Sequence, residues 1–140
     1  MAQHYEVVVF TAAMQDYADW VLDQIDPHRY VKHRLYRQHA MKRETSYIKD
    51  LSRLGRDIKK VIIVDNVCEN FQLQPENGIL IKSWVDDAND TALLELAPLL
   101  KEISKKKVAD VREALNKFSM QMSEQNELGL QNYQLSLDID

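Results

Sequence analysis

A run of four β-branched apolar residues, Val61 to Val64, constrains the fold of this chain more than any other feature. A strand with no polar position on either side has to be buried on both faces, as the strands of a parallel sheet are. Two residues with side-chain oxygens, Asp65 and Asn66, follow the run at once. Ligands of open α/β sheets bind beyond the carboxyl ends of the strands, so this pattern predicts an active site there. Carboxylate and amide oxygens also suit a hard cation such as Mg²⁺.

A second segment of the same kind lies near the start of the chain. Residues Tyr5 to Phe10 read Tyr-Glu-Val-Val-Val-Phe, which predicts another buried strand. Apolar residues between Met14 and Ile25 recur at spacings of three and four, which indicates an amphipathic helix that Pro27 ends. Thr11 stands between strand and helix, where its hydroxyl and the neighbouring amides are placed to bind a phosphate oxygen. A helix N-cap is the alternative role for Thr11.

The rest of the chain continues the α/β pattern. Residues 30–48 mix basic and apolar side chains without a helical period, which predicts short strands and a loop. Gly78 to Lys82 reads as a last short strand. Apolar residues at helical spacing then predict two helices, one from Asp90 to Lys107 and one from Val108 to Phe118. We expect both helices to cover the sheet.

Composition narrows the class of protein. The 140 residues are 45% hydrophobic, which is enough for one domain with a buried core. From Ser119 onward the chain is acidic and lacks a sustained period, so we expect a domain over residues 1–118 and a loose tail over 119–140. No apolar run approaches the roughly 20 residues of a membrane helix. The single Cys68 excludes an internal disulfide framework, so we expect a soluble intracellular protein, nuclear or cytoplasmic.

A band of positive charge runs from His28 to Lys60. The whole chain has 18 basic and 22 acidic residues, and four of the acidic ones lie in the tail. The preceding domain is therefore neutral overall, yet within the band eleven basic residues face three acidic ones. This excess invites an anionic partner, and a solvated basic surface is the alternative. We expect no nucleic acid partner, because no aromatic stacking platform or known binding motif accompanies the charge.

Several motifs from Tyr5 to Phe118 occur in an order that matches a known family. They are Phe10-Thr11-Ala12, Leu35-Tyr36-Arg37-Gln38-His39, Tyr47 to Asp57, Asp65-Asn66 and Ile81-Lys82-Ser83-Trp84. Together they resemble the catalytic domain of the RNA polymerase II C-terminal-domain phosphatases, in the small and Dullard-like, NLI-interacting-factor-like branch of the haloacid dehalogenase superfamily. The resemblance implies a three-layer α/β/α, Rossmann-like parallel sheet.

The resemblance also implies a function and a site. The family hydrolyses phosphoserine and phosphothreonine in proteins through an aspartyl-phosphate and needs Mg²⁺. It assigns Thr11 and Arg37 to the phosphate of a phosphorylated protein substrate. Lys49 would bind the same phosphate and neutralise charge on the nucleophile, and Asp65 with Asn66 would hold Mg²⁺. This division suits phosphoryl transfer, which needs positioning and charge neutralisation above all.

One family motif is absent. The first motif is a strand ending in Asp-x-Asp-x-Thr, which carries the nucleophilic aspartate, and no such pattern precedes Tyr5. In the superfamily that strand lies between the strands represented here by Tyr5–Phe10 and Val61–Val64. We therefore expect an N-terminally truncated sheet, completed by an upstream segment or a partner, and a phosphatase domain that is inactive as given. The alternatives are a non-catalytic protein-binding relative, like the mitochondrial translocase receptor of this fold, and a generic α/β domain that binds an anionic partner.

Overall fold

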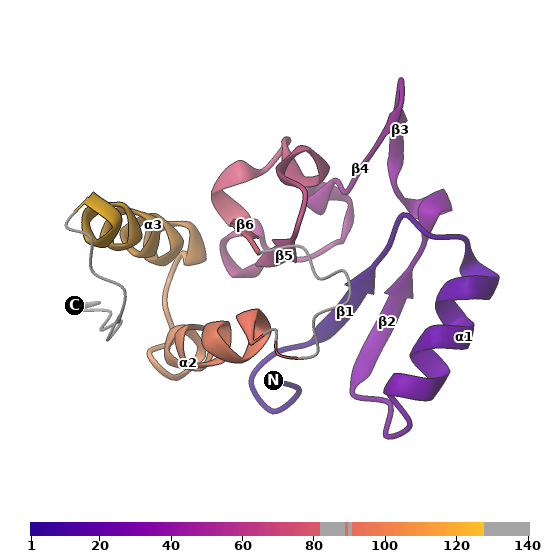
Figure 1. Cartoon of the computed structure of the whole chain (residues 1–140), viewed down its shortest axis with the longest axis horizontal. Coiled ribbons are helices and arrows are strands. Elements are labelled where there is room, and N and C mark those ends of the chain that lie inside the picture. Colours follow the sequence, from indigo (N-terminus) through magenta and orange to yellow (C-terminus); the bar gives the residue numbers. More distant parts are fainter. Residues whose placement is uncertain (82–88, 90, 128–140) are drawn as a thin grey trace.

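The structure of the chain, a computed structural model, describes residues 1–81, 89 and 91–127. Figure 1 shows two groups of elements, with β1, β2 and α1 at one side and β5, β6, α2 and α3 at the other. The elements are β1 (Val7–Phe10), α1 (Gln15–Ile25), β2 (Val31–Leu35), β3 (Met41–Arg43), β4 (Ser46–Ile48), β5 (Ile63–Asp65), β6 (Gly78–Leu80), α2 (Ala92–Lys105) and α3 (Val111–Glu127).

The strands of the described residues form three separate two-stranded sheets. β1 pairs with β2 in parallel, β5 pairs with β6 in parallel, and β3 and β4 form an antiparallel hairpin. The mixed α/β class with parallel strands is therefore confirmed. No ladder joins β1 to β5 in this part of the chain, so a three-layer arrangement around one sheet stays a prediction.

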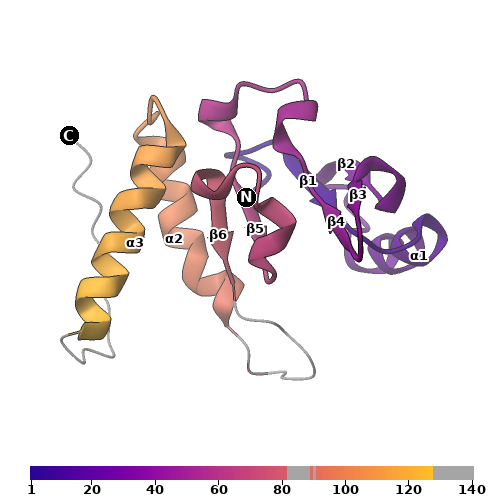
Figure 2. The same ribbon diagram turned by 90° about the horizontal axis from the view of Figure 1, so that it is seen from above.

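β5 is buried on both faces, which explains its apolar sequence. Ile63 packs with Leu51 and Phe71 in one cluster. Val64 packs instead against the larger cluster under α2 and α3, which lie together on one side of β5 and β6 in Figure 2. Successive side chains of a strand point to opposite faces, so two cores require an apolar residue at every position. The buried members of the larger cluster are Ile79, Leu96, Leu99, Ile103, Val108, Val111, Ala114 and Leu115.

β1 is less buried than its sequence predicts. Val8 is 36% exposed, and the other residues of the strand are only partly buried. On one side β1 pairs with β2, and α1, whose buried residues are Ala18 and Leu22, lies beside β2 in Figure 1. On its other side it borders a cleft, so the prediction of a strand buried on both faces is wrong for β1 in this structure.

The cleft between β1 and β5 has a volume of about 550 Å³. At one end Arg56, which precedes β5, donates to Glu6, which precedes β1, with an Nε to Oε1 distance of 2.9 Å. At the other end Lys49 lies beside Asp65 and Phe10, the last residues of the two strands. The two strands therefore run in the same direction along the cleft. Its lining includes Tyr5, Val7, Val8 and Phe10 on one side and Val61, Ile62, Ile63 and Val64 on the other.

The last helix is longer than predicted. Phe118 packs against the core cluster at the predicted end of the helix, but α3 continues to Glu127. The added stretch has no Gly or Pro to end the helix. Residues 119–127, expected to belong to a loose tail, are therefore helical, while 128–140 lie outside the described residues. So do Lys82, the predicted end of β6, and the Ser83-Trp84 part of the last family motif.

Replacing Gly78 by alanine is expected to destabilise the fold. A Cβ at this position would lie 2.2 Å from the ring of Phe71, which is only 5% exposed. Overpacking of this kind costs about 1–3 kcal/mol, so the free energy of unfolding in urea should fall by that amount. Leu80→Ala on the same strand, where the side chain is 59% exposed, is the matched control and should cost less than about 0.5 kcal/mol. An unchanged stability for Gly78→Ala would contradict this packing.

Candidate functional site

A buried ion pair lies where β4 and β5 end. Lys49 directly follows β4, and Asp65 is the last residue of β5. Their Nζ and Oδ2 atoms are 2.6 Å apart, and the side chains are 11% and 4% exposed. Little water reaches a pair this deep, so the attraction is screened far less than between surface charges. Either group alone would be an uncompensated buried charge.

Asn70 holds both partners of the ion pair. Its side-chain amide donates to the two carboxylate oxygens of Asp65 at 3.2 and 3.3 Å. Its backbone carbonyl accepts a hydrogen bond from the Lys49 amide at 2.8 Å. The Val67 amide donates to Asp65 Oδ1 at 3.0 Å, so the carboxylate is fixed from several sides. Asn70 belongs to a short 3₁₀ helix, Cys68–Phe71, in a segment that the sequence predicted only as a polar loop.

The segment after Lys49 is fixed by Asp50. Its Oδ1 accepts hydrogen bonds from the amide and the hydroxyl of Ser52 and from the side chain of Gln74. These hydrogen bonds, that of the Ser52 side chain first and that of Gln74 next, hold the pKa of Asp50 below its usual range. Gln74 also accepts from the Leu51 amide at 3.0 Å. The backbone that carries Lys49 is therefore tied to the loop that follows β5.

Thr11 and Arg37 meet at the carboxyl end of β1. Thr11 Oγ1 accepts a hydrogen bond from the Ala13 amide at 3.0 Å, and Arg37 Nε donates to the Ala12 carbonyl at 2.6 Å. The N-cap of α1 is Met14, so the alternative role of Thr11 as a helix cap is wrong. Because the Thr11 hydroxyl accepts here, its own hydrogen can be donated to a ligand. Arg37 makes its hydrogen bond through Nε, and its Nη edge has the fork geometry that binds phosphate.

The Thr11 and Arg37 pair lies next to the ion pair. The Lys49 Nζ is 5.9 Å from the ring centre of Phe10, the residue before Thr11. The Arg37 guanidinium lies 5.0 Å from the ring centre of Tyr47, two residues before Lys49. The structure thus brings the predicted residues together as two adjacent pairs, Thr11 with Arg37 and Lys49 with Asp65.

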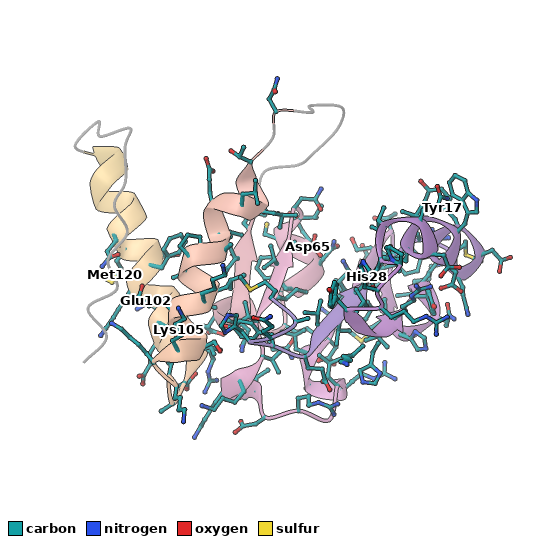
Figure 3. All side chains as sticks on the ribbon, turned by 90° about the horizontal axis from the view of Figure 1, so that it is seen from below. Tyr17, His28, Asp65, Glu102, Lys105 and Met120 are labelled. Carbon is teal, nitrogen blue, oxygen red and sulfur yellow. The ribbon has the colours of Figure 1, made fainter. Side chains whose placement is uncertain are left out.

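The last predicted site residue, Asn66, is exposed just beyond β5. Its neighbour Asp65 lies near the middle of the molecule in Figure 3, between the helices α2 and α3 and the group that contains α1. Asp65 and Asn66 are oxygen ligands of the kind that Mg²⁺ takes. Among the residues that the structure describes, no group of three or more His, Cys, Asp and Glu side chains is placed to hold a metal. The pair therefore fits a part of a Mg²⁺ ligand set.

The basic band is partly neutralised by acidic residues from outside it. Arg34 lies 3.0 Å from Asp19 and 2.9 Å from Asp23 on α1. Arg56 pairs with Glu6, and its hydrogen bond holds the pKa of Glu6 below the usual range. An anionic partner for the remaining charges stays a prediction.

The family model and the similar proteins found by comparison point to the same family. The family model of NLI interacting factor-like phosphatases matches residues 1–112. A probable C-terminal domain small phosphatase of Dictyostelium discoideum is 48% identical over 83% of this chain, and the human CTD small phosphatase-like protein is 44% identical over 75%. The mitochondrial import inner membrane translocase subunit tim50 of Aspergillus fumigatus is 42% identical over 83%. The chain spans only 37%, 38% and 23% of the length of these three proteins.

These matches correct our expectation of the cellular location. We expected a nuclear or cytoplasmic protein, but the similar proteins include subunits of a mitochondrial inner membrane translocase. Composition and a single cysteine do not separate these compartments, so that expectation was wrong. Within the described part of the chain, no helix is long and apolar enough to cross a membrane.

Replacing Lys49 by methionine should destabilise the protein strongly, because Asp65 would be left as a buried unpaired charge. Loss of one partner of a buried pair costs about 3–5 kcal/mol, measured here as the free energy of unfolding in urea. Lys49→Met/Asp65→Leu should recover most of that loss, since replacing both charges by apolar groups is often neutral. Lys42→Met, at an exposed position of the hairpin, is the control. Equal losses for Lys42→Met and Lys49→Met would contradict the buried pair.

Proposed function

The chain belongs to the NLI interacting factor-like phosphatase family, and we propose that it is part of a protein serine/threonine phosphatase of the Mg²⁺-dependent, aspartyl-phosphate type. The observation that carries this proposal is the buried contact of Lys49 with Asp65 at the carboxyl end of a parallel strand. A cation held this rigidly is suited to the charge that develops during phosphoryl transfer. We propose phosphorylated proteins as the substrate class, and the similarity to the C-terminal-domain phosphatases supports this proposal.

Each site residue has a role that its geometry supports. Lys49 supplies a fixed positive charge beside the transferred group, and Asn70 with Asp65 keeps its ammonium in place. The Thr11 hydroxyl donates to one phosphate oxygen, while the Nη edge of Arg37 takes two others in bidentate fashion. Positioning and charge neutralisation of this kind supply most of the catalysis of phosphoryl transfer.

Asp65 and Asn66 would hold Mg²⁺, with Asp65 as the charged ligand. When bound, the ion would neutralise charge on the phosphoryl oxygens. The remaining ligands would come from water and from a further carboxylate at the carboxyl end of the cleft. The Lys49 ammonium, 2.6 Å from Asp65, fixes the orientation of this carboxylate.

The attacking group is the part that residues 1–127 do not supply. No Asp-x-Asp pattern occurs in them, and Asp65 is engaged by Lys49 and Asn70. In the family the first strand would lie in the cleft between β1 and β5. It would bring a nucleophilic aspartate next to Lys49. We therefore propose that this strand, from the same polypeptide or another, completes both the sheet and the site.

A non-catalytic protein-binding role is the second candidate. It is favoured by the similarity to the translocase subunit, whose name describes protein import and not hydrolysis. In that case Lys49 and Asp65 would serve stability alone, and the site would not turn over a phosphate ester even with a complete strand.

As a single copy, the 140-residue chain should hydrolyse neither p-nitrophenyl phosphate nor phosphoserine peptides. Lys49, Asp65 and Asn66 stabilise an attack that no residue in the described part of the chain is placed to make. The measurement is phosphate release in Mg²⁺ at a dilution where light scattering shows one copy. Turnover clearly above buffer that disappears in Asp65→Asn would refute this proposal.

A fusion that adds the upstream segment of a phosphatase relative, including its Asp-x-Asp-x-Thr strand, should gain Mg²⁺-dependent phosphatase activity. Removing one group that stabilises charge in the transition state costs about 100- to 1,000-fold in rate. Lys49→Ala and Asn66→Ala in the fusion should therefore lower kcat by that order, and Lys42→Ala should leave it unchanged. A fusion in which the supplied nucleophilic aspartate is replaced by asparagine is the inactive control and gives the background rate of phosphate release.

Two outcomes of the fusion experiment would count against catalysis. A fusion that is folded and binds Mg²⁺ but stays inactive would favour the protein-binding role. Activity that is insensitive to Lys49→Ala in a folded fusion would show that the ion pair is structural only.

A further inference from the structure

The cleft between β1 and β5 has the features of a site for an extended strand. Among the described residues, β1 is paired only with β2 and β5 only with β6, so each strand has one free backbone edge. Both free edges border the same cleft of about 550 Å³. Free N–H and C=O groups of an edge strand are a template for another strand, and here two templates face one gap.

The two ends of the cleft set the direction and the chemistry of its occupant. β1 starts next to Glu6, which contacts Arg56 in the segment that leads into β5, and both strands end near Lys49. A parallel occupant would therefore enter at the Glu6 end and place its carboxyl end beside the Lys49 ammonium. Its apolar side chains would meet Val7, Val8 and the Val61–Val64 run. An apolar strand with carboxylates at its carboxyl end fits these conditions.

The chain itself contains one segment of this kind, which our sequence prediction of a loose tail missed. From residue 133 to 140, apolar and polar residues alternate without exception, with a period of two that is typical of a strand. Two aspartates, Asp138 and Asp140, lie at the carboxyl end of the segment. Its apolar residues are Tyr133, Leu135, Leu137 and Ile139, and its polar residues are Gln134, Ser136, Asp138 and Asp140.

We propose that residues 133–140 of one chain bind as a parallel strand in the cleft of a second copy. The segment would pair with β1 and β5 through its backbone, with Leu135 and Leu137 against the apolar lining. Its carboxylates would lie at the Lys49 end, where charge complementarity favours them. The proposal rests on the strand edges, the cleft and the sequence pattern, and it does not depend on the proposed phosphatase function.

The length of the connection favours a second copy over the chain's own cleft. The start of α3 packs against the 3₁₀ helix Ile58–Lys60, which leads into β5 and so lies at the entry end of the cleft. α3 then runs alongside β6 toward the opposite end in Figure 2, and its 17 residues rise by about 25 Å. The six steps of chain from Glu127 to Tyr133 span at most about 22 Å, which is less than the rise of α3, so they do not reach back to the entry end. A segment from a second copy has no such limit.

The test uses two full-length variants that each lose one half of the contact. Leu135→Lys/Leu137→Lys alters the segment and keeps the cleft. Val8→Lys alters the cleft and keeps the segment, and its charge is tolerated in the free chain because Val8 is 36% exposed. The matched controls are Gln131→Lys/Asn132→Lys, with the same added charge before the alternating segment, and Leu80→Lys, at a position 59% exposed outside the cleft. Light scattering and sedimentation report the mass, and circular dichroism reports folding.

The wild-type chain and both controls should associate, with at least a doubling of mass at tens of micromolar. Each of the two test variants should be monomeric on its own, with wild-type circular dichroism. Mixed together, they should form a one-to-one complex, because one supplies an intact cleft and the other an intact segment. A monomeric wild-type chain, or folded variants that fail to associate when mixed, would overturn the proposal. Association of the wild type that persists in both test variants would overturn it as well.

Discussion

The buried contact between Lys49 and Asp65 is the interaction on which the arrangement of this molecule depends. It connects the end of the hairpin to the end of β5. Asn70 reinforces this connection, because it binds the side chain of Asp65 and the backbone of Lys49. Two charges with little access to water have to stay together, because separation would leave each of them unsolvated. The same contact places a cation at the carboxyl end of the cleft, where a phosphate-binding site would need it.

Much of the fold follows from local sequence. The run Val61 to Val64 predicted a strand between two cores, and the clusters around Ile63 and Val64 confirm them. The helix before Pro27 and the short strands of the hairpin also follow from their patterns. The exposure of Val8 did not follow, because a sequence pattern shows that a strand can be covered on both faces but not whether the covering element is present.

The candidate site was predictable only in part. The contact of Lys49 with Asp65 agrees with the residues that the family resemblance named, but their roles in catalysis stay predictions. Asn70 was missed because a single amide in a polar loop gives no signal until the 3₁₀ helix that carries it is known. The alternation of residues 133–140 was visible in the sequence, but it acquired a meaning only once a cleft with two free strand edges was found.

Hydrogen exchange gives the most direct test of the central claim. This claim is that the free backbone edges of β1 and β5 both pair with one further strand that binds between them. The amides of Val7 to Phe10 and of Ile63 and Val64 should be compared between the monomeric Leu135→Lys/Leu137→Lys chain and its fusion to the supplied strand. If a strand pairs with both edges, amides on the cleft side of β1 and β5 should exchange at least about tenfold more slowly in the fusion, while those of the hairpin β3–β4 stay unchanged. Equal exchange at β1 and β5 in a folded fusion would contradict the account.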